Sequence, residues 1–143
     1  MYKKVMVAID GSKTANQALT EAANIANTYD ATLCIVHAVH GDTEADKKAG
    51  SEILEQAQSS AGTRKIEIRL LQSNIEYGLN GIAESIAAAA ADWEADLLVV
   101  GTANRRGLER FFVGSVAEQL VTRVSCAILL VRPQSTEKES GAH

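Results

Sequence analysis

Aromatic side chains are scarce in this chain of 143 residues: only 4% are Phe, Trp or Tyr, whereas 46% are hydrophobic. This composition excludes a core built from large rings and favours β-branched strands packed against alanine-lined helices. A chain of this length can bury one sizeable core, and a second domain would not fit.

The chain also lacks an excess of basic residues and any long apolar run. Fourteen Lys and Arg stand against eighteen Asp and Glu, a formal net charge of −4, which argues against broad binding to nucleic acid or an anionic membrane. No apolar run approaches the roughly 18 residues of a membrane span. The first residues, two lysines and a short apolar run without a cleavage pattern, predict a strand rather than a signal peptide. We therefore expect a soluble, cytoplasmic protein.

Cysteine is equally scarce. The chain has two, Cys34 and Cys126, which lie far apart in apolar segments. We expect both to be buried, reduced thiols. The sequence contains no Gly-x-x-x-x-Gly-Lys-Ser/Thr loop, no Gly-x-Gly-x-x-Gly after the first strand and no His-Glu-x-x-His. Walker-type hydrolysis, dinucleotide redox chemistry and zinc proteolysis lose support. No nucleophile stands beside a recognisable base and orienting acid, so the sequence predicts no dedicated catalysis.

Apolar periodicity predicts five strands that alternate with four helices. The strands are expected at 5–9, 33–39, 65–70, 97–100 and 127–131. The first helix begins at Ser12 as N-cap and carries an apolar stripe of Ala15, Ala18, Leu19, Ala22, Ala26 and Tyr29. The second helical pattern is weaker and carries Ile53, Leu54 and Ala57. The third has a stripe that ends at Trp93, and the fourth has Val116, Leu120, Val121 and Val124.

Strands joined by helices run parallel most simply, with right-handed crossovers. The predicted fold is therefore a single-domain α/β protein with an open, doubly wound parallel sheet of the Rossmann or flavodoxin kind, in the order 3-2-1-4-5. The charged and apolar alternation of 65–70 predicts a strand at the sheet edge. Pro133 ends the predicted domain, 1–133, and the polar tail 134–143 is expected to be disordered.

Ligands of such sheets bind beyond the carboxyl ends of the strands, where the winding direction reverses. Here that means the loops after the first and fourth strands. Gly114 and Ser115 begin the fourth helix and suit an anion, because glycine allows close approach, the hydroxyl donates, and helical N–H groups are free. The alternative is a capping box from Ser115 to Glu118, which would explain both residues without a ligand.

The segment Gly-Thr-Ala-Asn-Arg-Arg-Gly-Leu-Glu-Arg-Phe-Phe-Val-Gly-Ser-Val-Ala-Glu, from Gly101, resembles the phosphate loop of the universal stress protein family. The opening Lys-Val-Met-Val-Ala-Ile-Asp-Gly-Ser, the segments 35–39 and 95–101, and the closing run 125–133 resemble that family too. Its ATP-binding branch carries a glycine, two residues, a second glycine, nine residues, then glycine and serine or threonine. This chain matches at Gly101, Gly114 and Ser115. It has Asn104 at the second glycine position, where asparagine tolerates the left-handed conformation better than most residues.

The resemblance implies an ATP site, with Mg²⁺ beside the phosphates. It implies adenine and ribose near Ala8, Ile9, Asp10, Ala38 and Val100. It implies phosphates at Gly101, Gly114, Ser115 and the backbone of Val116, with Asn104 and Arg105 from the same loop.

Five side chains keep two interpretations each. Asp10 either contacts the nucleoside and a metal ion or only makes an Asp-Gly turn. Arg105, with Arg106 and Arg110, either binds phosphate or is solvated on the surface. We expect His37 to be a packed or hydrogen-bonded core residue rather than a base.

The implied function is that of a stress-response or signalling regulator that binds ATP and hydrolyses it weakly at most. The resemblance also implies a homodimer paired through strand 127–131, whose apolar edge needs covering, and an unidentified protein partner. Two alternatives stay open. One is a nucleotide-free dimeric interaction module, because Asn104 moves the chain toward the family branch that lacks the glycine pattern. The other is a slow ATP hydrolase.

Overall fold

The computed structural model describes residues 1–102 and 114–132 and shows a five-stranded parallel sheet in the order β3-β2-β1-β4-β5. The strands are β1 (Lys4–Ala8), β2 (Thr32–Val39), β3 (Ile66–Gln72), β4 (Leu97–Gly101) and β5 (Ala127–Val131). The helices are α1 (Lys13–Tyr29), α2 (Glu44–Ala61), α3 (Gly78–Trp93) and α4 (Ser115–Arg123), and a 3₁₀ turn, η1 (Ile75–Tyr77), precedes α3. The predicted α/β class and strand order are confirmed.

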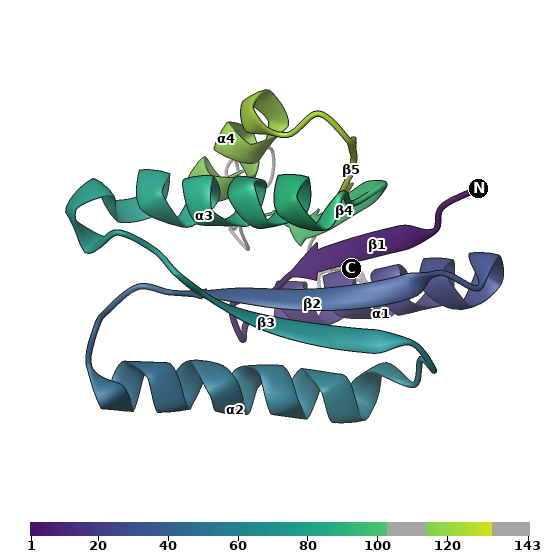
Figure 1. Cartoon of the computed structure of the whole chain (residues 1–143), viewed down its shortest axis with the longest axis horizontal. Helices are drawn as coiled ribbons and strands as arrows, with labels where there is room; N and C mark the ends of the chain where they lie inside the picture. Colours follow the sequence, from purple (N-terminus) through teal and green to yellow (C-terminus); the bar gives the residue numbers. More distant parts are fainter. Residues whose placement is uncertain (103–113, 133–143) are drawn as a thin grey trace, which may run out of the picture.

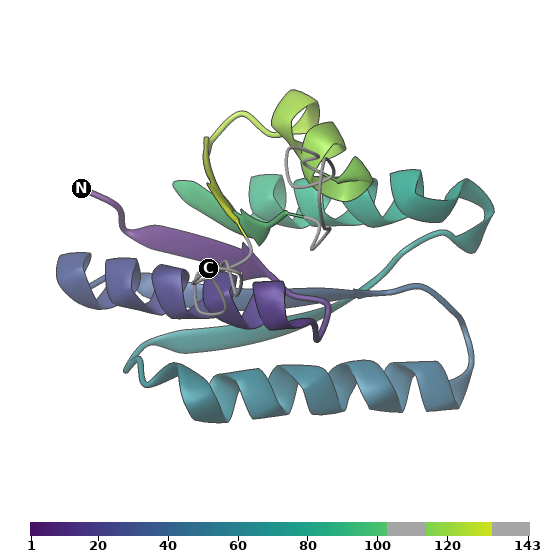
Figure 2. The same ribbon diagram turned by 180° about the vertical axis from the view of Figure 1, so that it is seen from behind.

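Helices cover both faces of the sheet, as Figure 1 and the reverse view in Figure 2 show. Helices α1 and α2 lie on one face, and α3 and α4 lie on the other. Because side chains alternate along a strand, Val5 and Val7 of β1 pack toward α1 whereas Met6 packs toward α3 and α4. Burial on both faces explains why β1, β2 and β4 read as nearly continuous apolar runs.

Alanine makes up most of the α1 stripe, and four alanines of this stripe are buried against the sheet: Ala15, Ala18, Ala22 and Ala26. Small side chains let a helix lie close to the strands, as the scarcity of aromatics predicts. The last residue of the predicted stripe is not buried: Tyr29 is 42% exposed and packs edge-to-face on Tyr2, with ring centroids 5.5 Å apart.

Two further predictions of burial are wrong, and both concern the sheet edge at β5. Val121 is 52% exposed, because the nine-residue helix α4 buries Ala117 and Leu120 and turns Val121 to solvent. Cys126 is a free, half-buried thiol just before β5, where the sheet has a neighbour on one side only. Cys34, in the second strand, is free and buried as expected.

Polar contacts tie the amino ends of β1 and β4 together. Asp96 Oδ2 accepts hydrogen bonds from the backbone N–H groups of Lys3 and Lys4, at 2.8 and 2.9 Å. The Nζ atom of Lys4 donates to the backbone carbonyl of Trp93 at 2.6 Å and lies 4.8 Å from the centroid of the Trp93 ring.

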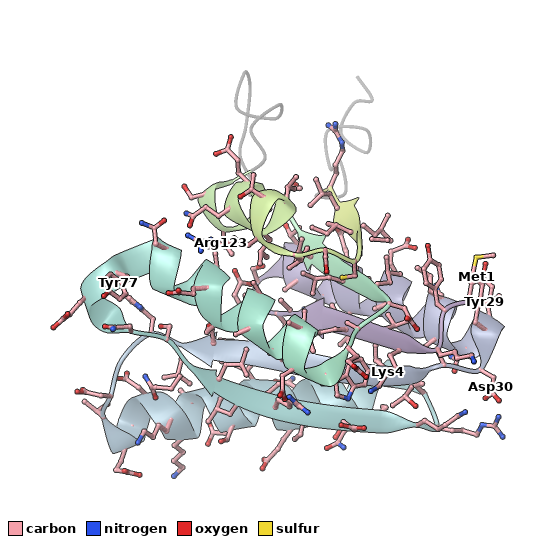
Figure 3. The ribbon with its side chains drawn as sticks, turned by 45° about the horizontal axis from the view of Figure 1, so that its top comes forward. Met1, Lys4, Tyr29, Asp30, Tyr77 and Arg123 are labelled. Atoms are coloured by element: carbon pink, nitrogen blue, oxygen red, sulfur yellow. The ribbon has the colours of Figure 1, made fainter. Side chains whose placement is uncertain are left out.

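Figure 3 shows Tyr77, before α3, at the end of the molecule opposite Tyr29. The carboxyl ends of the strands lie at the Tyr77 end.

None of the helices within residues 1–102 and 114–132 combines the length and apolar character needed to cross a bilayer.

Candidate functional site

A pocket of about 220 Å³ opens at the carboxyl ends of β1, β2 and β4. In the sheet order, β2 and β3 follow β1 on one side, and β4 and β5 lie on its other side. The helices of the two halves cover opposite faces, so the winding direction reverses at β1, which is the switch point of the sheet. The volume lies just below the roughly 300–1,000 Å³ typical of small-molecule sites. The lining combines strand ends, the first turns of α1 and α4, and the side of α3: Ala8, Ile9, Asp10, Ser12, Thr14, Ala15, His37, Ala38, Ile82, Ile86, Val100, Gly101, Thr102, Val116 and Ala117.

Seven of the eleven residues predicted for the site line this pocket: Ala8, Ile9, Asp10, Ala38, Val100, Gly101 and Val116. Gly114 and Ser115 directly precede Val116 in the chain. The two other predicted residues, Asn104 and Arg105, lie outside the described residues, as do Arg106 and Arg110. The pocket therefore gathers residues from both predicted loops at one place.

The turn after β1 is built by its own side chains. Asp10 Oδ1 accepts from the backbone N–H of Ser12 at 3.0 Å, and Gly11 takes φ +87°, a conformation that favours glycine. Ser12 Oγ in turn accepts from the Ala15 N–H at 3.1 Å, so Ser12 is the N-cap of α1, as predicted. The Asp-Gly turn is thus present, and it brings the Asp10 carboxylate to the wall of the pocket.

Gly101 ends β4 in direct contact with the first turn of α1. A Cβ atom at this position would stand 2.7 Å from Thr14 Cγ2 and 3.1 Å from the Thr14 carbonyl oxygen. Real Cβ atoms essentially never stand 2.7 Å from another heavy atom, so a side chain at position 101 would force β4 or the first turn of α1 to shift. The contact brings the β4 end and the α1 first turn to the same side of the pocket.

The start of α4 differs from the predicted capping box. Gly114, not Ser115, is the N-cap, with φ +100° and ψ 146°, and it brings no side chain to cap the helix. Ser115 is the first helical residue, and the N–H of Glu118 bonds to the Gly114 carbonyl at 2.9 Å. The capping interpretation of Ser115 and Glu118 is therefore wrong. The first N–H groups of α4 keep the polarity that suits an anion.

His37 is held by the backbone at the end of β1, since its Nδ1 lies 2.8 Å from the Ile9 carbonyl oxygen. A carbonyl can only accept, so Nδ1 carries the proton and donates it in this bond. The hydrogen-bonded role predicted for His37 is confirmed. Its place in the pocket wall was not predicted, because a histidine within an apolar strand gives no sign of what its ring faces.

Two buried threonines complete the polar part of the pocket. Thr14 is 4% exposed and Thr102 is 9% exposed. The Thr102 N–H bonds to the Val131 carbonyl at 2.9 Å. Thr14 Oγ1, in contrast, is buried and has no hydrogen-bond partner among the described residues. Sequence periodicity gives no signal for Thr14, since it occupies the first turn of a helix whose stripe begins one residue later.

A second depression, of about 610 Å³, lies between α1 and α2 and is lined by exposed helical side chains such as Asn16, Thr20 and Gln56. It touches the carboxyl edge of the sheet only at Ile9 and Gly11, and none of the buried side chains without a partner lines it. Within the described part of the chain, no three His, Cys, Asp or Glu side chains gather as a metal site. The pocket at the switch point is therefore the candidate site.

A doubly wound parallel sheet with an apolar pocket at its switch point defines the class of α/β ligand-binding domains. Within that class, the model of the universal stress protein family matches residues 1–132. The chain belongs to the universal stress protein family.

Curated relatives bear the same family name. A universal stress protein of Staphylococcus saprophyticus is 30% identical over 153 residues, covering 96% of this chain and 88% of that protein. One of Staphylococcus aureus strain USA300 is 32% identical over 150 residues, covering 93% and 86%.

Solved structures share the fold. A universal stress protein in complex with cAMP is 26% identical, has a TM-score of 0.74 and covers 91% of this chain and 97% of its own. A family member from Burkholderia pseudomallei is 29% identical, with a TM-score of 0.69 and coverage of 91% and 96%.

Proposed function

We propose that this protein binds ATP, with Mg²⁺, in the pocket at the switch point, and that nucleotide binding regulates a stress-response or signalling output. The observation that carries the proposal is the start of α4: a glycine-only backbone at Gly114 presents a helix with no side-chain cap beside an apolar pocket. Phosphate groups suit such a helix end, and a flat base suits the apolar walls. A related structure holding cAMP supports an adenine nucleotide as the ligand class.

The proposal assigns a set of residues to each part of the ligand. The base and ribose are assigned to Ala8, Ile9, Ala38 and Val100, with Asp10 at the rim for the nucleoside or the metal ion. The phosphates are assigned to a second set, which includes two residues outside the described part of the chain: Gly101, Asn104, Arg105, Gly114, Ser115 and Val116.

Binding without dedicated catalysis fits the polar contacts of the pocket. Asp10 Oδ1 and His37 Nδ1 are both engaged by backbone groups of the β1 turn, at 3.0 and 2.8 Å. Among residues 1–102 and 114–132, neither is hydrogen-bonded to a side-chain nucleophile. We also propose a cytoplasmic location, which free thiols at Cys34 and Cys126 support.

The test is calorimetric titration of the purified protein with ATP and MgCl₂, preceded by mass spectrometry of any nucleotide released on denaturation. We expect near-stoichiometric ATP in the purified protein or saturable ATP binding in the titration. We expect weaker ATP binding in a Gly114→Ala variant, because alanine disfavours φ +100° and displaces the start of α4. A Gly62→Ala variant is the matched control, since Gly62 also has positive φ but lies at the end of α2. An empty protein without binding heat would overturn the proposal in favour of the nucleotide-free interaction module.

A homodimer is the second part of the proposal. Strand β5 is an edge of the sheet, and its five residues, Ala-Ile-Leu-Leu-Val, are apolar and at least partly exposed. The other edge, β3, carries Glu67 and Arg69, which discourage pairing. The apolar edge is therefore where a second copy gains most by pairing.

A further inference from the structure

Thr14 lines the pocket, and its side-chain hydroxyl is buried without a hydrogen-bond partner among the described residues. The residue as a whole is 4% exposed. Buried hydroxyl groups in proteins nearly always have a partner, because an unpaired one loses its bond to water without compensation. An unpaired hydroxyl in a pocket wall points to a partner that the pocket receives.

The position of Thr14 explains why the helix itself cannot supply that partner. Threonines inside α1 donate to the carbonyl four residues back: Thr20 to Asn16 at 3.1 Å and Thr28 to Asn24 at 2.8 Å. Thr14 is only the second residue of α1, so the residues three and four before it lie in the turn, outside the helix. The usual carbonyl acceptor is therefore missing behind it.

Gly101 fixes the environment of the same side chain. The Thr14 methyl group, Cγ2, lies against Gly101, where even one added carbon would stand 2.7 Å away. Gly101 belongs to the loop proposed to hold phosphate, and Val100 before it belongs to the proposed nucleoside wall. Thr14 thus lies at the junction of the two parts of the proposed ligand.

We propose that Thr14 Oγ1 donates a hydrogen bond to an oxygen of the sugar–phosphate part of the bound nucleotide. The contact rests on the proposed function and names a residue of the site that its sequence pattern leaves out. Sugar hydroxyl and phosphate oxygens are both hydrogen-bond acceptors, and the shared chemistry is an oxygen acceptor within reach of the first turn of α1.

The experiment compares the wild type with Thr14→Val, which removes the hydroxyl and keeps the branched shape. Thr63→Val is the matched control, because Thr63 Oγ1 is also buried without a partner but does not line the pocket. Each protein is titrated calorimetrically with Mg-ATP, AMP and adenosine, and its thermal unfolding is followed without ligand. Loss of an unpaired hydroxyl is expected to leave Tm unchanged or to raise it in both variants.

Nucleotide affinity is expected to fall by roughly two- to tenfold in Thr14→Val, the range for one hydrogen bond, and to stay constant in Thr63→Val. A loss for all three ligands assigns the bond to the sugar, and a loss for AMP and ATP alone assigns it to phosphate. Unchanged affinity in Thr14→Val overturns the Thr14 contact and leaves the ATP site standing. A wild type that binds none of the ligands overturns the proposed function and the contact with it.

A Thr14→Ser variant keeps the experiment decisive where Thr14→Val unfolds, because serine retains the hydroxyl and leaves space where the methyl group was. Wild-type affinity in Thr14→Ser, beside a loss in Thr14→Ala, supports the bond. Equal losses in both overturn it.

Discussion

The thiol of Cys34 lies in the middle of the sheet, fully buried between β1 and β3. Burial raises its pKa from 9.0 to about 11, because the interior disfavours the charged thiolate. Above pH 9 the unfolded chain therefore loses a proton that the folded chain keeps, and the free energy of unfolding falls until about pH 11. The expected loss from this thiol is about 2 to 3 kcal/mol.

Urea unfolding at pH 8 and pH 11 measures this loss. A Cys34→Ala variant is expected to be less stable at pH 8 but to lose less stability at alkaline pH than the wild type. Cys126→Ala is the control, because Cys126 is only half-buried and its variant should keep most of the alkaline drop. The same pH dependence in the wild type and Cys34→Ala would contradict the assignment.

Gly101 shows how one missing side chain lets a strand and a helix meet at the pocket. In Gly101→Ala the added Cβ would stand 2.7 Å from Thr14 Cγ2, so α1 and β4 must move apart. We expect a loss of about 1 to 3 kcal/mol in the free energy of unfolding, typical of overpacking, together with weaker nucleotide binding. Urea denaturation and calorimetric titration measure the two effects.

A double-mutant cycle separates the clash from other effects of alanine. Thr14→Ser removes the Cγ2 atom, so the cost of Gly101→Ala should be smaller in the Thr14→Ser background than in the wild type. Additive costs would show that the Thr14 methyl group is not what Gly101 accommodates.

At the scale of elements, α2 begins with a capping box made by its own side chains. Thr43 Oγ1 accepts from the Asp46 N–H at 3.0 Å, and Asp46 Oδ2 accepts from the Thr43 N–H at 3.4 Å. Loss of this capping box in Thr43→Ala should lower the free energy of unfolding by about 1 kcal/mol. Thr28→Ala is the control, since Thr28 is an exposed helical threonine that caps nothing, and alanine is the better helix former. Chemical denaturation that finds equal effects for both would contradict the role of the cap.

Strands β1, β2 and β4 were predictable from sequence because burial on both faces leaves apolar runs such as that of β4. Helix starts were less predictable. The pattern Thr43-x-x-Asp46 caps α2, whereas Ser115-x-x-Glu118 fits the capping-box pattern better and caps nothing. The difference is the backbone of Gly114, whose positive φ takes the N-cap position and moves Ser115 into the helix. A side-chain pattern does not contain that dihedral angle.

The pocket was predictable where it is made by strand ends and not where helices complete it. Ala8 and Val100 follow from topology, because carboxyl ends of parallel strands share one edge. Ile82 of α3 and Thr14 of α1 reach the pocket only through the packing of each helix on its own face of the sheet. That placement is a tertiary property, and periodicity along the chain carries no information about it.

At the scale of the whole molecule, the two sheet edges differ in what protects them. On β3, Glu67 Oε1 accepts from the Trp93 Nε1 at 3.2 Å, and Arg69 pairs with Asp92 at 3.2 Å. Strand β5 presents apolar side chains instead, from Ala127 to Val131. Charged groups on an edge oppose pairing with another chain, so of the two edges of the described sheet β5 is the one suited to self-association.

The backbone of β5 shows which positions would face a second copy in the proposed dimer. The Val131 carbonyl accepts from Thr102 beyond the end of β4, so Val131 and Leu129 direct their backbone groups toward β4. Alternate residues of a strand direct these groups to opposite sides, and Leu130 therefore directs its N–H away from β4. Proline at this position removes a donor on the outer edge and leaves the pairing with β4 intact.

We therefore expect the wild type to be a dimer in solution at micromolar concentration and Leu130→Pro to shift it to monomer. Leu130→Ala is the control, because it shortens the same side chain but keeps the N–H, so it should retain more of the dimer than Leu130→Pro. Analytical ultracentrifugation gives the masses, and circular dichroism checks that both variants remain folded. A monomeric wild type contradicts the dimer. Equal dissociation of the two variants contradicts backbone pairing through β5 and indicates a contact made by side chains alone.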